Sequence, residues 1–167
     1  MIIQHSTLNI QHSVSDMIIR AAHDNDVDDI AAIVADFARQ GHLLPRTVDN
    51  IRASLQQWML AEVDGRIVGI GSLFPMGAGL IEVRSIAVLA EYRSLGAGAA
   101  IVQALVDEAK RRGYASVFAL TRAVPFFERL GFEITLKDNF PEKVWRDCVI
   151  CPLYHACDET AVVRPLR

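Results

Sequence analysis

Long apolar runs are missing from this 167-residue chain, and none approaches the roughly 20 residues that a membrane-spanning helix requires. Positive charge is not in excess either, because the net charge is −3, so no basic field favours nucleic acid. Three cysteines suit a reducing cytoplasm better than a disulfide framework. The first residues lack the basic start and apolar core of a secretory signal. We therefore expect a cytoplasmic protein that binds neither membrane nor nucleic acid.

What is present is the composition of a globular domain, with 51% hydrophobic and 22% charged residues. The start of the chain stands apart from it, because the tetrapeptide Ile-Gln-His-Ser occurs at 3–6 and again at 10–13 without an amphipathic period. We expect residues 1–16 to form a disordered extension and residues 17–167 to form a single domain. Deleting residues 1–16 should then leave folding and activity intact.

Hydrophobic periodicity predicts strands in hairpins first and strands alternating with helices later. A first strand over 17–22 precedes a helix capped by Asp24 and ended by Gly41. The remaining predicted elements are helices over 46–57, 96–112 and 124–130, strands over 58–63, 66–74, 80–88, 115–121, 132–136 and 160–163, and turns at Asp64-Gly65 and at Pro75 with Gly77 and Gly79. After residue 136 we expect a polar, cysteine-bearing loop before the last strand. This order predicts a mixed α/β sheet with helices on both faces.

The segment between the strand over 80–88 and the following helix reads Arg-Ser-Leu-Gly-Ala-Gly, residues 93–98. Its glycines let backbone N–H groups approach a ligand closely, and the new helix directs its positive end to the same place. A pyrophosphate suits such a cradle. The third glycine of a dinucleotide-binding loop and the Gly-Lys-Ser/Thr of a P-loop are both absent. A tight strand-to-helix turn without a ligand is the structural alternative.

This loop resembles the R/Q-x-x-G-x-G/A loop of the GNAT superfamily of acetyl-CoA-dependent N-acetyltransferases. Residues 85–88, Ser-Ile-Ala-Val, are similar to the central strand of that family. Residues 126–132, Phe-Phe-Glu-Arg-Leu-Gly-Phe, are similar to its closing helix–strand step. The resemblance covers about residues 17–165. It implies the GNAT fold, with a mixed, mostly antiparallel sheet of six to seven strands, and acetyl-CoA as co-substrate.

Coenzyme A has an expected place in this pattern. Backbone N–H groups of residues 95–99 would hold its pyrophosphate, with charge added by Arg93. Ile86 and Val88 would pair with the pantetheine arm if the sheet splays open there. The residues that the resemblance assigns to coenzyme A are Ile86, Ala87, Val88, Arg93, Ser94, Leu95, Gly96, Ala97, Gly98, Ala99 and Phe127.

The resemblance also makes Glu82 the candidate general base, because an amine must lose a proton before it attacks a thioester. The alternative is an ion pair with Arg84, two residues on and on the same strand face, and both roles are compatible. Phe127 stands where the family often has a tyrosine that protonates the leaving thiolate. We assign no general acid, and this gap keeps a non-catalytic acyl-CoA-binding sensor open as an alternative.

Within the superfamily, the chain most resembles the acetyltransferase domain of N-acetylglutamate synthase, through residues 43–47, 82–88, 118–121 and 141–144. The resemblance implies transfer to the α-amine of a small amino acid, L-glutamate first, as in arginine biosynthesis. Arg46 is the expected carboxylate anchor, because a guanidinium binds a carboxylate through two hydrogen bonds. The full set of expected substrate residues is Leu44, Arg46, Arg84, Thr121 and Arg122.

Alternatives to this substrate remain. Each arginine could be a solvated surface charge, and the acceptor could be a peptide N-terminus, a polyamine or an aminoglycoside. A homodimer through the C-terminal strands is possible, as GNAT domains often form one.

The C-terminal region contains Cys148, Cys151, His155 and Cys157, which are the ligand types of a zinc site. Their spacing is too tight and irregular for common zinc ribbons. We expect reduced thiols and no metal, with zinc as the alternative. A catalytic cysteine is not needed, because direct attack by the amine requires no protein nucleophile.

Overall fold

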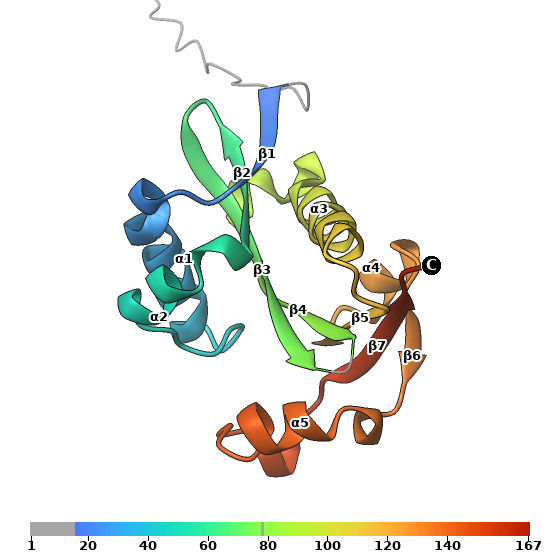
Figure 1. Cartoon of the computed structure of the whole chain (residues 1–167). Coiled ribbons are helices and arrows are strands. Elements are labelled where there is room, and N and C mark those ends of the chain that lie inside the picture. Colours follow the sequence, from blue (N-terminus) through green and yellow to red (C-terminus); the bar gives the residue numbers. More distant parts are fainter. Residues whose placement is uncertain (1–15, 78) are drawn as a thin grey trace, which may run out of the picture.

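The computed structural model of the chain describes residues 16–77 and 79–167, and its ribbon is shown in Figure 1. The strands are β1 (Met17–Ala21), β2 (Trp58–Val63), β3 (Arg66–Gly77), β4 (Leu80–Val88), β5 (Ser116–Thr121), β6 (Glu133–Thr135) and β7 (Thr160–Pro165). The helices are α1 (Val27–Arg39), α2 (Val48–Ala53), α3 (Ala97–Arg111), α4 (Val124–Arg129) and α5 (Pro141–Lys143). The expectation for the repeat-containing start falls on residues 1–15, outside the described residues, and Asp16 alone of that segment is described.

All seven strands form one sheet in the order β1-β2-β3-β4-β5-β7-β6. Among the strands of the described residues, β4 and β5 alone pair in parallel. Helices α1 and α2 cover one face and α3 covers the other (Figure 1). The predicted fold is therefore confirmed, a mostly antiparallel mixed sheet of seven strands between helices. None of the helices in the described part of the chain is both long and apolar enough to cross a membrane.

Two apolar cores, one on each face, hold the helices to the sheet. On one face, Ile30 and Val34 of α1 pack with the buried side chains of β2 and β3. On the other, Ile101 and Leu105 of α3 pack with buried residues of β2 to β5. Both helical pairs follow the spacing that the sequence predicts, so burial of one apolar stripe fixes each helix on its face.

Two local predictions need correction. Helix α1 begins at Val27 after a short 3₁₀ turn over Asp24–Asp26, so Asp24 does not directly precede it. Strand β3 continues through Pro75 to Gly77 and does not turn at the proline. Beyond Ser72, β3 has no register with β2, and proline is tolerated where a strand has one neighbour.

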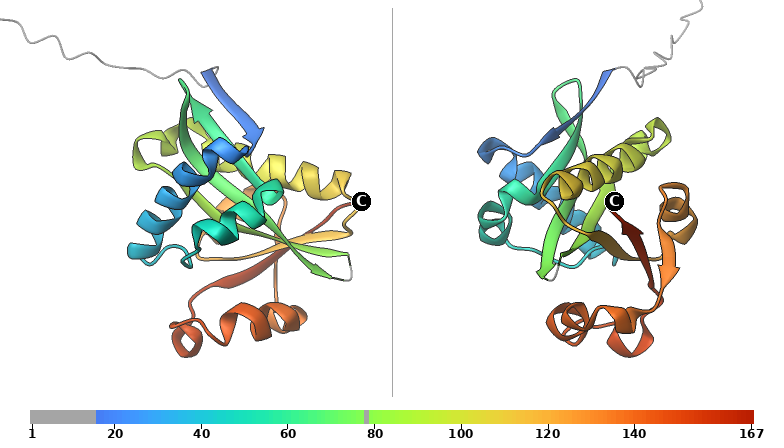
Figure 2. Two further views of the ribbon diagram at one scale, coloured as in Figure 1. Left: turned by 60° about the vertical axis from the view of Figure 1, so that its left-hand side comes forward. Right: turned by 45° about the vertical axis from the view of Figure 1, so that its right-hand side comes forward.

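The predicted polar loop before the last strand is largely helical. It contains η5 (Lys137–Asn139), α5, the π-helical turn η6 (Val144–Cys148) and η7 (Tyr154–Ala156). Both views in Figure 2 place this orange-to-red segment at one end of the sheet, beside β7 and away from the α1 and α3 layers. We call residues 137–159 the C-terminal segment.

Candidate active site

Strands β4 and β5 separate in the middle of the sheet. Their ladder pairs Leu80–Glu82 with Ser116–Phe118 and extends no further in the described part of the chain. A bulge follows in β4, because Ser72 pairs with Arg84 while Ile70 pairs with Ala87, which leaves two β4 residues opposite one. Ser85 within the bulge has a left-handed φ of 57°. The sheet therefore splays at residues 83–88, which is the condition set for pairing with a pantetheine arm.

The glycine of β3 that faces this bulge is sterically required. A Cβ on Gly71 would lie 2.5 Å from Cδ1 of Ile86 and 2.6 Å from Cγ2 of Ile101. Those two side chains come from β4 and from α3, so the β4 bulge and the helix both pack against the backbone of β3 at Gly71. The absence of a side chain at Gly71 thus lets α3 sit close behind the splayed strand.

The predicted anion cradle is open to solvent. Gly96 lies at φ 75° directly before α3, and a Cβ built on it would meet nothing within 4 Å. Arg93, Ser94 and Gly96 are exposed. The Arg93 side chain donates from Nε to the carbonyl of Val88 at 3.3 Å, which ties the cradle to the end of β4. An exposed left-handed turn ahead of a 15-residue helix fits a diphosphate, because N–H groups and helix dipole point at one place.

A cavity of about 670 Å³ lies beside the splay and is lined by the C-terminal segment as well as by β4 and β5. It brings together most of the residues predicted for substrate and chemistry: Leu44, Arg46, Glu82, Arg84, Ile86, Thr121, Arg122 and Phe127. The other predicted coenzyme A residues, Ala87, Val88 and 93–99, do not line it. The two sets therefore form adjoining regions, an acceptor cavity and an open cradle.

Glu82, in the lining of this cavity, belongs to a buried charge network. Its side chain is 3% exposed, and its Oε1 lies 2.8 Å from Nζ of Lys143. The same Nζ lies 2.8 Å from Oδ2 of Asp147, which in turn accepts from Arg84 at 3.3 Å. The expected Glu82–Arg84 pair is present but longer, at 3.8 Å. Glu82 is thus held mainly by Lys143, a residue to which the sequence patterns gave no role.

Burial dominates the protonation of this network. It raises the pKa of Glu82 above its ordinary value, although the nearby charges of Lys143 and Arg84 oppose that rise. Burial and, after it, the like charge of Arg46 lower the pKa of Arg84 to about 10. Burial also opposes the charge of Lys143, but Glu82 and Asp147 outweigh it and raise the lysine pKa. The carboxyl of Glu82 is therefore poised to take up a proton more readily than an exposed glutamate.

Two buried atoms of the cavity lining lack hydrogen-bond partners among the described residues. Nε of Arg46 donates no hydrogen bond and Oε2 of Glu82 accepts none within the described part of the chain. Burial lowers the pKa of Arg46, while the negative charges of Asp147 and Glu82 partly offset this effect. Unpartnered buried polar atoms are costly, so a donor and an acceptor left open in one cavity indicate a ligand with complementary groups.

Two other predicted substrate residues already have protein partners. Arg122 donates to Asp158 at 2.6 Å, and this contact raises its pKa. Thr121 accepts at its hydroxyl from the backbone N–H of Ala123 at 2.9 Å. Both line the cavity, but their main polar groups are engaged, unlike the Nε of Arg46.

Phe127 is 5% exposed and packs edge-to-face between Phe126 and Phe132, with ring centroids 5.2 and 5.1 Å away. Its ring contributes to the main core as well as to the cavity lining. The position therefore supplies an apolar wall and no proton.

The cysteines and histidine of the C-terminal segment are not gathered as the ligands of one metal ion would be. Within the described residues, no three His, Cys, Asp or Glu side chains are placed to hold an ion. Cys148, Cys151 and Cys157 are free thiols that line the acceptor cavity. Burial raises the pKa of Cys148, which disfavours its thiolate.

Comparison with known proteins agrees with this geometry. A sequence profile described as the acetyltransferase (GNAT) family matches residues 27–132. The chain belongs to this family and is an N-acetyltransferase of the GNAT type. Enzymes of this family use acetyl-CoA as the acetyl donor. The resemblance inferred from the motifs is thereby confirmed.

The chain is similar in sequence to individual N-acetyltransferases. An uncharacterised N-acetyltransferase of Chlorobaculum tepidum is 36% identical over 91% of this chain and 98% of its own length. An amino-acid acetyltransferase of Shewanella oneidensis is 31% identical over 75% of this chain, but the match spans only 28% of that protein.

Solved structures of proteins in complex with coenzyme A are also similar to this chain. N-acetylglutamate synthase from Neisseria gonorrhoeae, complexed with coenzyme A and N-acetyl-glutamate, has a TM-score of 0.78 and 26% identity, covering 90% of this chain and 35% of that one. A Mycobacterium tuberculosis protein in complex with coenzyme A and a second ligand has a TM-score of 0.75 and 25% identity, covering 90% and 99%.

Proposed function

We propose that the protein transfers the acetyl group of acetyl-CoA to the α-amine of a small amino acid, L-glutamate first, by direct attack. The observation that carries this proposal is the pair of unpartnered atoms in the acceptor cavity, Nε of Arg46 and Oε2 of Glu82. An α-amino acid has one group for each, a carboxylate for the guanidinium and an amine for the carboxylate.

Charge balance favours an acidic side chain. Arg46, Arg84 and Lys143 face Glu82 and Asp147, which leaves one net positive charge in the buried network. The other charged residues of the lining are two of each sign: Arg122, Lys137, Asp138 and Glu159. Glutamate as a zwitterion has a net charge of −1 and balances the cavity, whereas a neutral amino acid does not.

Arg84 is the proposed second anchor, for the side-chain carboxylate. Its guanidinium lies over the ring of Phe74, with Cζ 3.7 Å from the ring centroid, and it donates a hydrogen bond of 3.3 Å to Asp147. Stacking fixes the plane of the guanidinium and leaves hydrogen-bonding capacity at its edge. Leu44 supplies an apolar part of the cavity lining, to which Thr121 and Arg122 also belong.

In the proposed reaction, Oε2 of Glu82 accepts a proton from the amine so that the nitrogen attacks as the free base. Acetyl-CoA supplies the activated acyl group when it is bound. The exposed cradle around Gly96 would hold its diphosphate, and the unpaired side of β4 at Ile86–Val88 would hold its pantetheine arm. No cysteine takes part, and the leaving thiolate receives its proton from solvent, because Phe127 offers none.

The test is release of coenzyme A thiol from acetyl-CoA with a panel of acceptors: L-glutamate, L-glutamine, L-aspartate, D-glutamate, spermidine and a short peptide. The proposal predicts the highest kcat/KM for L-glutamate. A higher kcat/KM for spermidine or for the peptide would show that the acceptor is that compound and not an amino acid. Binding of coenzyme A without turnover for any acceptor would identify a sensor.

A further inference from the structure

Lys143 contacts the carboxylates of both Glu82 and Asp147, and it lies closer to each of them than Arg84 does, at 3.8 and 3.3 Å. Its Nζ makes two contacts of 2.8 Å, to Oε1 of Glu82 and to Oδ2 of Asp147, and the residue is 7% exposed. Lysine is rarely buried to this degree without a specific partner. The pairing spans 61 positions of sequence, so it is tertiary structure and not local chain geometry that sets it.

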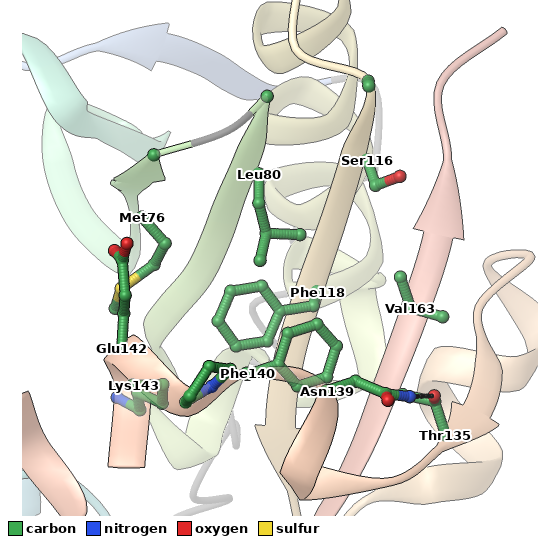
Figure 3. A pocket seen from close by; sticks show the side chains of 14 residues that line it. Met76, Leu80, Ser116, Phe118, Thr135, Asn139, Phe140, Glu142, Lys143 and Val163 are labelled. Carbon is green, nitrogen blue, oxygen red and sulfur yellow. Dashed lines mark hydrogen bonds between the residues drawn. The ribbon is translucent and has the colours of Figure 1, made fainter. Parts of the chain in front are cut away.

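An aromatic stack places Lys143 there. Phe140 lies on Phe118 with ring centroids 4.1 Å apart and planes 8° from parallel, and Figure 3 shows the two rings against each other. Phe118 is also the residue that pairs with Glu82 in the short β4–β5 ladder. Lys143 follows Phe140 by three residues, close to one helical turn. The stack therefore anchors the start of α5 over the strand that neighbours the carboxylate.

The contact uses one carboxylate oxygen and leaves the other. Oε1 of Glu82 is engaged by Lys143, whereas Oε2 is the buried atom without a hydrogen-bond partner. We propose that Lys143 is a positioning residue for the base: it fixes Oε1, keeps the carboxyl ionised, and so directs Oε2 at the acceptor amine. This inference rests on the proposed function, because it requires that Glu82 act as the base.

The charges around Glu82 predict how its ionisation responds to substitution. Lys143 from α5, Arg84 from β4 and Arg46 from the loop before α2 favour the ionised form, while Asp147 from η6 opposes it. Burial pushes in the same direction as Asp147. Removing Lys143 should therefore move protonation of Glu82 to higher pH, and neutralising Asp147 should move it to lower pH.

The experiment measures kcat/KM for the amino acid against pH in Lys143→Met, Lys143→Arg, Asp147→Asn and Glu82→Gln. Lys143→Met should lose roughly ten- to hundredfold at pH 7 and shift the acidic limb upward by about one pH unit or more. Lys143→Arg should return the acidic limb of the pH profile most of the way to its wild-type position. Asp147→Asn should shift that limb to lower pH. The KM for acetyl-CoA should stay constant in all four. Lys110→Met, on the exposed side of α3, is the matched control.

Opposite shifts at Lys143 and Asp147 would not arise from a purely structural role. The proposal is overturned if Lys143→Met keeps the wild-type limb, or if it loses activity equally at every pH and Lys143→Arg does not recover it. Should Lys143→Met fail to fold, the direction of the Asp147→Asn shift decides. If Glu82→Gln retains full activity, the base assignment fails first and the proposed function needs another base. If Glu82→Gln alone loses activity, Glu82 remains the proposed base and Lys143 has no positioning role.

Discussion

Arg46 and Glu82 each contribute one buried hydrogen-bonding atom to the same cavity, and neither atom has a hydrogen-bond partner within the described part of the chain. One is a donor and the other an acceptor. The pair therefore defines a ligand with an anionic end and an amine end, and it distinguishes the acceptor cavity from the open cradle before α3.

Glu82→Gln should remove the general base while preserving shape and burial. We expect kcat to fall by about 10²- to 10⁴-fold, the usual contribution of a positioned base. In the wild type, burial raises the pKa of Glu82, so activity should decline with acid at a pH above the ordinary glutamate value of about 4.3. A kcat/KM profile against pH measures both effects. Glu142→Gln, an exposed neighbour on α5, should behave as wild type.

Arg46→Ala should raise the KM for the amino acid roughly ten- to hundredfold, the worth of a charge-assisted hydrogen bond. The KM for acetyl-CoA should remain unchanged, because Arg46 lies in the acceptor cavity and not at the cradle. Steady-state kinetics with each substrate varied in turn separates the two. Arg39→Ala, exposed on α1, is the control. An unchanged amino-acid KM in Arg46→Ala would remove this residue from the site.

Arg93→Ala should give the reverse pattern. The exposed guanidinium lies beside the cradle, so its loss should weaken acetyl-CoA binding by about tenfold and leave the amino-acid KM intact. Isothermal titration with coenzyme A gives the affinity directly. Equal loss for both substrates would mean that the Nε contact to Val88 matters for the shape of β4 and not for the ligand.

Asp26 links stability to pH through Arg20, which donates to both of its carboxylate oxygens at 2.7 and 2.8 Å. The hydrogen bond from Arg20 is the main reason that the pKa of Asp26 lies below its ordinary value. A depressed folded-state pKa means that the stabilisation is complete above the unfolded value of about 3.9 and is lost as pH falls through the folded value.

Asp26→Asn should therefore lower the free energy of unfolding by about 1–3 kcal/mol at pH 7. The difference from wild type should shrink below about pH 4. Urea unfolding at several pH values checks this, with the exposed Asp28→Asn as the control, expected to change less than half as much. A gap between wild type and Asp26→Asn that does not depend on pH would contradict the linkage.

Most of the fold could be predicted from the sequence because its signals are local. The spans 58–63 and 80–88 match β2 and β4, and the Asp64-Gly65 turn has the positive φ values that this dipeptide supports. The helix predicted over 96–112 agrees with α3 to within one residue at each end. Alternating or 3.6-residue hydrophobicity decides each of these elements before tertiary contacts do.

The C-terminal segment is where local signals fail. Residues 141–148 form about two turns of irregular helix, too short to show an apolar period, and the stack of Phe140 on Phe118 holds them in place. The role of Lys143 could not be predicted from local sequence either, because its partner Glu82 lies 61 positions away in the chain. The expected Arg84 partner of Glu82 was found, but at a longer distance than the lysine that sequence patterns did not assign.

The most direct test of the central claim is to incubate the full chain with acetyl-CoA and L-glutamate and to measure thiol release and the mass of the product together. The account predicts N-acetylglutamate and free coenzyme A in equal amounts, with product formation abolished or reduced more than a hundredfold in Glu82→Gln. Thiol release without an N-acetylated amino acid, or no turnover although coenzyme A binds, would contradict it.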